Sequence, residues 1–353
     1  MVAAVPHKEL VGNKTVIAKT SPDVQPVCIE CGNAAAPKPC RPAFRVWQQR
    51  PIAFFRCRRC GLIFKDPSVY RAEDEFSFDS MTLSPQPETL SKFRETFHTD
   101  GQIADERGRL YPTFGYDQDE LVSGIFDSVE RKLRQHADLT PQSRFRLLEV
   151  GCATGFLLAR LRERYPRAEL IGVDPSPFSV RRAQQVEGVT VHCGTLPSVP
   201  LEPASFDVVV MIGNFQLHRD PPATLEQIFR LLKPEGLLIF DTKNPVSWFR
   251  GAGRVLSRAW PLSRLRVVRR LVSSSHTGMR YGVPKALLRA WLTRAGFEIL
   301  QLSTKNLRVF EFSNTRPVSH GVRRWVWNVL NTIDVLRDQR AWLDVCCRKP
   351  SPW

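Results

Sequence analysis

The stretch that decides the fold is FRLLEVGCATGFLLARLRERYPRAELIGVD, residues 145–174. It opens with a short apolar run of the kind that forms a parallel strand buried on both faces. A glycine turn follows, and residues 156–165 then carry leucines on one side and arginines on the other, which predicts an amphipathic helix. Pro166 ends that helix, and a second apolar run, 170–173, leads to Asp174. This order predicts the first half of a nucleotide-binding βαβ unit.

Two glycines and one acid give the unit its ligand chemistry. Gly151 lets the chain turn sharply beside a ligand, and Gly155 lets the following helix approach the sheet. Asp174 ends the second strand about 20 residues past the turn, where a carboxylate can accept both hydroxyls of a ribose. The spacing therefore predicts a ligand with an adenosine-like ribose.

The turn itself, residues 149–155, reads EVGCATG and separates two nucleotide-binding families. A dinucleotide site needs G-x-G-x-x-G, and this turn has an acid before it and no third glycine in register. It resembles motif I of the class I S-adenosylmethionine-dependent methyltransferases, acid-x-Gly-x-Gly-x-Gly, with Ala153 in place of the central glycine. Another Rossmann cofactor, or a turn without a nucleotide, is the alternative.

Later segments continue the resemblance in order. Residues 205–210 look like the fourth strand of the family, 232–236 like the turn before the fifth strand, and 237–240 like that strand. An amphipathic helix at 287–297 leads to a strand at 298–302, and 341–348 reads as the last strand of a mixed sheet. The resemblance thus implies a Rossmann-like α/β methyltransferase sheet from residue 145 onward.

The resemblance also implies a set of cofactor contacts. Glu149 would anchor the loop or the amino group of S-adenosylmethionine, the glycines would wrap its methionine moiety, and Asp174 would hold its ribose. The acid that often meets the adenine is missing at 194–196, so backbone groups are expected there. The expected cofactor site comprises Glu149, Gly151, Cys152, Ala153, Gly155, Asp174, Pro175, Thr195, Leu196 and Asn214.

Four cysteines near the amino terminus predict a metal site. Cys28 and Cys31 form one C-x-x-C-G pair, and Cys57 and Cys60 form a second after a gap of 25 residues. Thiolates at this spacing on two glycine-ended turns can complete a tetrahedral four-cysteine zinc site, with no position open for chemistry. Two disulfides are the alternative, which we disfavour because no secretory apolar segment follows Met1.

The remaining cysteines have no partners at comparable spacing and are interpreted as small buried apolar residues. They are Cys40, Cys152, Cys193, Cys346 and Cys347. The domain organisation expected from these patterns is a disordered tail at 1–25, a zinc ribbon at 26–67, a connector with helices at 68–140, and a methyltransferase domain at 141–350 with a basic lid insertion at 246–280.

Much of the formal net charge of +16 lies in one stretch, 246–272, which has seven arginines and no acid. Tryptophans and leucines alternate with the arginines, so the stretch suits an anionic membrane surface, RNA phosphates, a nucleotide-linked substrate, or a lid over the site. A solvated basic face is the plainer interpretation. No apolar run approaches the roughly 20 residues that span a bilayer, so we expect a soluble cytoplasmic protein, peripheral to the membrane if this stretch binds lipid.

Two histidines are candidates for a general base, because imidazole titrates near neutral pH. His218 follows the fourth strand, and His276 resembles a histidine that related small-molecule methyltransferases keep before their penultimate helix. Either could instead be a hydrogen-bonding loop residue.

The resemblance implies methyl transfer from S-adenosylmethionine to oxygen or carbon of a small-molecule or carrier-linked acceptor, with sugars or envelope glycans among the acceptors of related zinc-bearing enzymes. An RNA methyltransferase, gripping phosphates with the ribbon and the arginine stretch, is one alternative. A non-catalytic adaptor that docks a partner through its zinc ribbon is the other.

Overall fold

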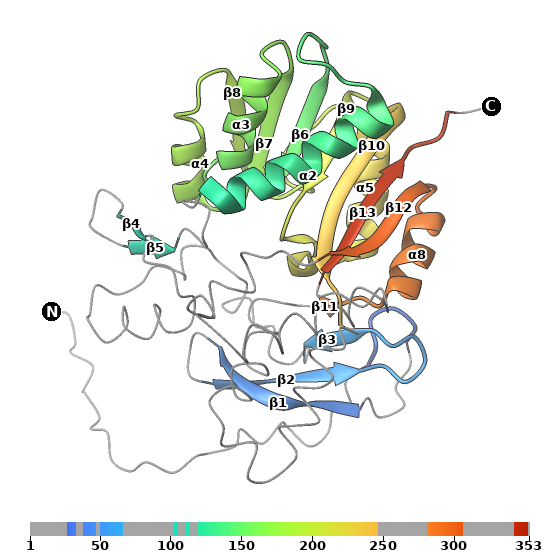
Figure 1. Cartoon of the computed structure of the whole chain (residues 1–353). Helices are drawn as coiled ribbons and strands as arrows, with labels where there is room; N and C mark the ends of the chain where they lie inside the picture. Colours follow the sequence, from blue (N-terminus) through green and yellow to red (C-terminus); the bar gives the residue numbers. More distant parts are fainter. Residues whose placement is uncertain are drawn as a thin grey trace, which may run out of the picture.

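The computed structural model describes part of the chain, namely residues 27–32, 38–46, 50–65, 102–104, 110–112, 119–245, 281–305 and 342–351. The proposed tail at 1–25, the arginine-rich stretch 246–272 and His276 lie outside these residues. Figure 1 shows two bodies of structure, a large sheet with helices and a smaller sheet beneath it.

The large sheet has seven strands in the order β12-β13-β10-β9-β6-β7-β8. Strands β6 to β10 run parallel, and β13 is antiparallel to both of its neighbours. The Rossmann-like α/β sheet expected from the sequence is confirmed, including its mixed edge. The strands are β6 (Arg146–Val150), β7 (Glu169–Asp174), β8 (Val189–Cys193), β9 (Phe206–Met211), β10 (Leu232–Lys243), β12 (Glu298–Lys305) and β13 (Trp342–Arg348).

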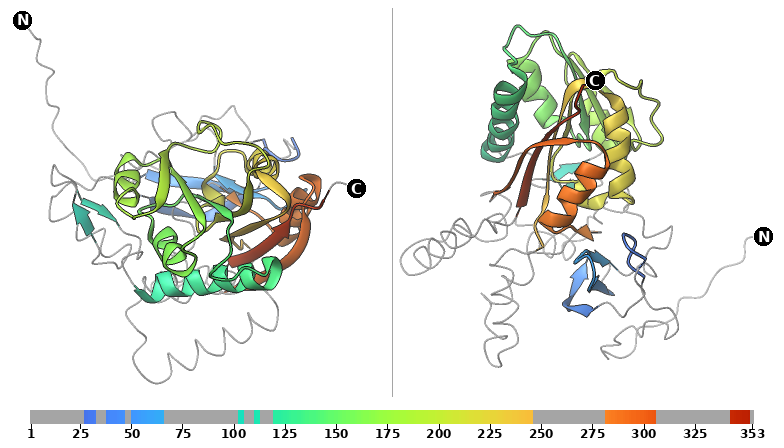
Figure 2. Two further views of the ribbon diagram at one scale, coloured as in Figure 1. Left: turned by 90° about the horizontal axis from the view of Figure 1, so that it is seen from above. Right: turned by 90° about the vertical axis from the view of Figure 1, so that its right-hand side faces the viewer.

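Helices cover both faces of this sheet, as the turned view in Figure 2 shows. Helices α2, α3 and α4 pack on one face and α5 and α8 on the other. Strand β9 contributes side chains to the apolar cores on both faces of the sheet, because Val208 and Val210 point to the first face and Val209 to the second. The helices are α2 (Asp119–Ala137), α3 (Phe156–Arg164), α4 (Pro177–Ala183), α5 (Pro221–Leu231), α8 (Lys285–Arg294) and the short 3-10 helix η4 (Phe215–Leu217).

Helix α2 begins before the boundary expected at residue 141. Its buried side chains Ile125, Val129 and Leu133 share a core with β6 and α3. The core of the large sheet therefore draws on residues that the sequence assigned to the connector. Within the described residues, no helix is long and apolar enough to cross a membrane.

The small sheet has the order β1-β2-β3-β11, all antiparallel. Strands β1 (Lys38–Val46), β2 (Arg50–Arg56) and β3 (Ile63–Lys65) come from the cysteine region, as expected for a ribbon. The fourth, β11 (Tyr281–Gly282), comes from the segment just before α8. A separate hairpin joins β4 (Gln102–Ala104) to β5 (Leu110–Pro112).

The small sheet and the large sheet share one apolar core. Leu62 and Phe64 are almost fully buried in the same cluster as Leu288 and Trp291 of α8. Burying side chains of this size contributes roughly 1.5–3 kcal/mol each. The cysteine ribbon is therefore packed against the sheet that follows it in the chain.

A largely buried network of four charges joins α2 to the mixed edge of the large sheet. Lys305 Nζ lies 2.8 Å from Asp344 and 3.0 Å from Asp241, while Lys132 Nζ lies 2.9 Å from Asp344. Burial acts to raise the pKa of Asp344, but Lys305 and Lys132 outweigh it and hold that pKa below its usual value. Asp241 Oδ1 also accepts a hydrogen bond of 2.6 Å from the Gly213 N–H, so the network reaches the turn after β9.

Replacing Lys305 with methionine is expected to lower the free energy of unfolding by about 3–5 kcal/mol, because the Asp241 and Asp344 carboxylates lose their shared cation while buried. Urea unfolding followed by circular dichroism measures the change. Arg289→Met on the exposed side of α8 is the control, with an expected change within about 0.5 kcal/mol. Equal stability of the two variants would show that the network contributes nothing net.

Candidate functional site

The glycine loop between β6 and α3 is shaped by close contacts that leave no room for side chains. Gly151 has φ +72°, and a Cβ there would lie 2.1 Å from Asn214 Nδ2. Gly155 has φ +81°, and its Cβ would lie 3.0 Å from that of Ala183 in α4. Both glycines are therefore required by packing as well as by backbone conformation.

Ala153 occupies the left-handed region with φ +46°, which is uncommon for a residue with a Cβ. This explains why the related motif carries glycine at this position. The backbone N–H of Ala153 donates a 2.9 Å hydrogen bond to Asp174 Oδ2, and that bond helps to hold the strained turn.

Ala153→Gly is expected to raise the free energy of unfolding by about 0.5–1 kcal/mol, because the left-handed conformation costs glycine little. Thermal unfolding by calorimetry tests this, with Ala168→Gly, a buried alanine outside the loop, as a control that should destabilise. A loss of stability in Ala153→Gly would show that the turn carries no relievable strain.

Asp174 ties the glycine loop to the end of β7. Its other oxygen, Oδ1, accepts a 2.9 Å hydrogen bond from the Ser176 N–H. The side chain is almost fully buried, and burial raises the pKa of Asp174 to about 6 although the two N–H donors act to lower it. The carboxylate is thus held at the carboxyl end of β7, where the sequence predicted it.

Two buried acceptors beside the loop have no donor among the described residues. They are Glu149 Oε2 and Asn214 Oδ1. Asn214 Nδ2 donates a 2.6 Å bond to the Val150 carbonyl, which orients its oxygen. Burial, and then the neighbouring Asp174 carboxylate, raise the pKa of Glu149 well above its usual value. The pair suits a cationic donor, since a nearby positive charge favours the ionised carboxylate.

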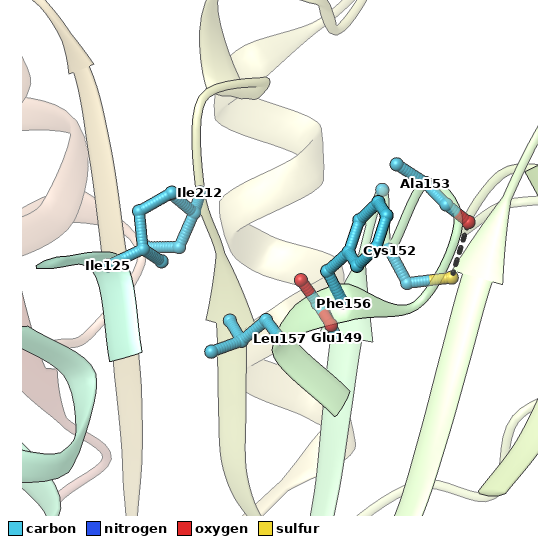
Figure 3. A pocket seen from close by; sticks show the side chains of 8 residues that line it. Ile125, Glu149, Cys152, Ala153, Phe156, Leu157 and Ile212 are labelled. Atoms are coloured by element: carbon cyan, nitrogen blue, oxygen red, sulfur yellow. Dashed lines mark hydrogen bonds between the residues drawn. The ribbon is translucent and has the colours of Figure 1, made fainter. Parts of the chain in front are cut away.

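A pocket opens beside the loop between α2, α3 and the end of β9 (Figure 3). Its lining includes the expected residues Glu149, Gly151, Cys152 and Ala153. Sequence reasoning missed the apolar part of the wall, which consists of Ile125, Phe156, Leu157 and Ile212. Phe156 and Leu157 begin α3 directly after the glycine turn. Their place next to the turn is the sequence feature from which their position in the pocket wall could have been predicted.

The other expected cofactor residues lie along the neighbouring strand ends. Pro175 and Thr195 are exposed, whereas Leu196 is buried and its carbonyl accepts a 2.8 Å bond from Gln227 Nε2. Gly194 N–H donates to the Asp174 carbonyl at 2.9 Å, so the ends of β7 and β8 are adjacent. The expected cofactor residues that do not line the pocket of Figure 3 are Gly155, Asp174, Pro175, Thr195, Leu196 and Asn214.

His218 directly follows η4 and is half-buried. The Thr224 hydroxyl donates to the Asp220 carbonyl at 2.9 Å, so the 3.3 Å contact between His218 Nδ1 and Thr224 Oγ1 has the histidine as donor. In that tautomer the basic lone pair is on Nε2. A role for His218 as a base stays a prediction, and His276 lies outside the described residues.

The four cysteine sulfurs lie within 4.8 Å of one another. Cys28 Sγ is 3.6 Å from Cys60 Sγ, and Cys31 Sγ is 3.5 Å from Cys57 Sγ. A disulfide needs about 2.0 Å, whereas sulfurs bound tetrahedrally to zinc at about 2.3 Å lie roughly 3.8 Å apart. The sulfur positions therefore fit a zinc site and leave the disulfide alternative without support.

The two cysteine turns have the same backbone hydrogen bonds, which aim each sulfur inward. The Gly32 N–H donates to the Cys28 carbonyl at 2.9 Å, and the Gly61 N–H to the Cys57 carbonyl at 3.1 Å. Both glycines have positive φ, which closes each turn. Burial raises the pKa of the Cys28 thiol, while backbone N–H groups of Cys60 and Arg59 outweigh burial and lower the pKa of Cys57 to about 7.

The prediction that the other cysteines are buried is wrong for Cys193. This residue is the last of the edge strand β8 and is exposed, although it lies on the same side of the strand as the buried Val191, because it stands at the strand end beyond the packed core. Cys152, Cys346 and Cys347 are buried as expected.

Comparison with known proteins gives this arrangement a family. A methyltransferase-domain family matches residues 141–269. Malonyl-[acyl-carrier protein] O-methyltransferases are 32% identical over 135 residues in Bacillus cereus, covering 37% of this chain and 48% of that protein, and 31% identical over 135 residues in Acetivibrio thermocellus, covering 37% and 44%. The chain thus spans about half the length of the curated relatives it matches.

Solved structures of methyltransferases are also similar at low identity. An S-adenosylmethionine-dependent methyltransferase from Mesorhizobium loti has 19% identity and a TM-score of 0.41, covering 63% of this chain and 99% of its own. The plantazolicin methyltransferase BpumL, in complex with a substrate analogue and SAH, has 16% identity and a TM-score of 0.42, covering 67% and 88%.

The strand order, the loop between β6 and α3 and the match over 141–269 agree on one family. The class I resemblance expected from residues 145–174 is confirmed. Residues 141–269 match a methyltransferase-domain family, and a four-cysteine cluster precedes these residues in the chain.

Proposed function

We propose that this protein transfers a methyl group from S-adenosylmethionine to an oxygen or carbon atom of a small-molecule or carrier-linked acceptor. The observation that carries the proposal is a group of three acceptors around the glycine loop: the buried side chains of Glu149 and Asp174, and the buried Oδ1 atom of the half-buried Asn214. Two of them hold an oxygen without a donor, at a loop shaped by glycines for close approach.

These residues fit the parts of the cofactor by their chemistry. Asp174 would accept the ribose hydroxyls, and the unpaired oxygens of Glu149 and Asn214 would accept from the methionine ammonium. When bound, the cofactor supplies a sulfonium-linked methyl group. The chain would contribute orientation and exclusion of water, using the apolar wall of Ile125, Phe156 and Ile212. His218, through Nε2, would take the proton from a hydroxyl acceptor.

The named relatives favour one acceptor class. Malonyl-[acyl-carrier protein] O-methyltransferases match the part of the chain that holds the cofactor loop. We therefore place a carboxylate or hydroxyl oxygen on a carrier-linked acyl group first, ahead of free sugars or glycans. Incubation with radiolabelled S-adenosylmethionine and a panel of acyl carriers, nucleotide sugars and structured RNA tests this order. Label only in RNA, decreasing steeply with salt, would reverse it.

The four cysteines are proposed to hold one structural zinc ion. Four thiolates close the coordination shell, so the ion would stabilise the ribbon without taking part in methyl transfer. The sulfur separations of 3.5 and 3.6 Å support this assignment.

Cofactor identity is tested by isothermal titration of the zinc-replete protein with S-adenosylmethionine and, separately, with NADH. We expect micromolar binding of the first and no heat from the second. Binding of neither ligand by well-folded protein would favour a non-catalytic adaptor, and binding of NADH alone would favour a dehydrogenase.

Cofactor affinity is expected to fall in acid. The ionised Asp174 accepts the ribose hydroxyls, and its pKa is about 6. Below that pH the affinity should drop about tenfold per unit, because the proton must first be removed. Because the pKa of Asp174 is higher in the folded than in the unfolded chain, protonation of Asp174 stabilises the free protein below about pH 4, and this contribution is lost as the pH rises through 6. Acid therefore does not unfold the protein through Asp174, and weaker binding at pH 5 cannot be attributed to such unfolding. Titrations at pH 5, 6 and 7.5 measure the effect, and a flat profile would contradict it.

A further inference from the structure

The two-residue strand β11 connects the cysteine ribbon to the large sheet. Tyr281 pairs with Phe64 and Gly282 with Ile63, which makes β11 the fourth strand of the ribbon sheet. Among the described strands, β3 alone pairs with β11. Figure 1 shows β11 between β3 and the ends of the large sheet. A strand this short keeps its conformation through its neighbours, since an isolated pair of strands is marginally stable in water.

Tyr281 extends from β11 to the loop that follows β9. The residue is 5% exposed, and its hydroxyl donates a 2.8 Å hydrogen bond to the Arg219 carbonyl. Arg219 directly follows His218 and ends the loop 213–219, which begins with the Gly213 and Asn214 contacts described above. One end of this loop is therefore held by hydrogen bonds from Gly213 to Asp241 and from Asn214 to the Val150 carbonyl, and the other end by the bond from Tyr281.

The loop also shares an apolar cluster with the ribbon. Phe215 of η4 is fully buried in the same apolar cluster as Phe64 and Tyr281. Phe64 stands opposite Tyr281 in the strand pair. Disordering the ribbon would thus remove both the strand partner of β11 and part of the packing beneath η4.

We propose that Tyr281 is a positioning residue that transmits the folded, metal-bound state of the cysteine ribbon to loop 213–219, which carries Asn214 and His218. The proposal rests on the zinc assignment above. It extends that assignment, because the metal-bound ribbon would then order the loop that carries His218 as well as its own strands. It requires no contact between the metal and the substrate.

The test uses amide hydrogen exchange of the full chain, read by mass spectrometry on peptides covering 213–219. The Leu217 and His218 amides donate to Asn214 and Phe215 carbonyls, so their exchange reports opening of this loop. Tyr281→Phe removes the hydroxyl and keeps the ring. We expect about fivefold faster loop exchange with unchanged zinc content, the size expected from losing one hydrogen bond. Tyr165→Phe, a buried tyrosine in the other core cluster, is the control and should leave loop exchange unchanged.

Chelating the metal tests the coupling itself. In the wild type, chelation should speed loop exchange; in Tyr281→Phe it should add clearly less, because the shared route is already broken. Unchanged loop exchange on Tyr281→Phe, or equal chelation effects in both proteins, would overturn the proposal. Cofactor titration of the same samples separates the methyltransferase proposal from the coupling proposal. Failure to bind S-adenosylmethionine would count against methyl transfer but would not change the conclusion drawn from hydrogen exchange. Protein that carries no zinc would remove the metal assignment, and with it the coupling.

Discussion

Replacing Asp174 with alanine should weaken binding of S-adenosylmethionine by at least about 100-fold. Two hydroxyl donors of the ribose would lose a charged acceptor, and each such hydrogen bond is worth roughly 1.5–3 kcal/mol. The variant also releases the Ala153 and Ser176 N–H groups, so the glycine loop loses the bonds that hold its strained turn. Isothermal titration of the wild type and the variant at pH 7.5 measures the loss.

The matched control for this variant is Asp207→Ala. Asp207 also accepts a backbone hydrogen bond, 2.8 Å from the Arg146 N–H, but it lies at the start of β9, on the opposite edge of the sheet. Its removal should leave cofactor affinity unchanged. Asp174→Asn refines the result, because an amide keeps the size of the side chain without its charge, and the variant should bind without the dependence on acid. Full affinity in Asp174→Ala would place the ribose elsewhere.

The sequence could predict those candidate site residues whose type is required by the local conformation of the chain. Glu149, Gly151 and Asp174 lie within one βαβ unit, and the conformational demands of the turn specify their types. The parallel pairing of β6 with β7, which adjacent apolar runs already indicate, brings Glu149 and Gly151 of the pocket wall close to Asp174, which does not line the pocket itself.

The remaining wall of the site depends on contacts between distant segments. Ile125 comes from α2 and Ile212 from the end of β9, and both resemble ordinary core residues in the sequence. The same holds for β11, a two-residue strand whose partner lies more than 200 positions earlier in the chain. Because a strand this short carries no periodicity, only the folded structure shows that the ribbon reaches the loop of His218.

The network of charged residues around Asp344 could not be predicted from the sequence either. Lys132, Asp241 and Lys305 stand on three separate elements, and each alone reads as a surface residue. Lys132 and Asp241 are buried and Lys305 is largely covered because α2 crosses the antiparallel edge of the sheet, an arrangement that helix and strand patterns do not specify. Pairing and hydrogen bonds offset the cost of burying them.

Cys60→Ser is expected to abolish tight zinc binding and to unfold the ribbon. Three thiolates leave the tetrahedral shell open, and structural zinc contributes on the order of 10 kcal/mol to folding when four are present. Since Leu62 and Phe64 share a core with Leu288 and Trp291, the loss should also lower the melting temperature of the whole protein. Metal analysis after dialysis and calorimetry measure both effects. Cys193→Ser, at the exposed cysteine, should retain zinc and stability. Full zinc content in Cys60→Ser would show that the sulfur cluster, despite its tetrahedral spacing, does not hold the metal through all four thiolates.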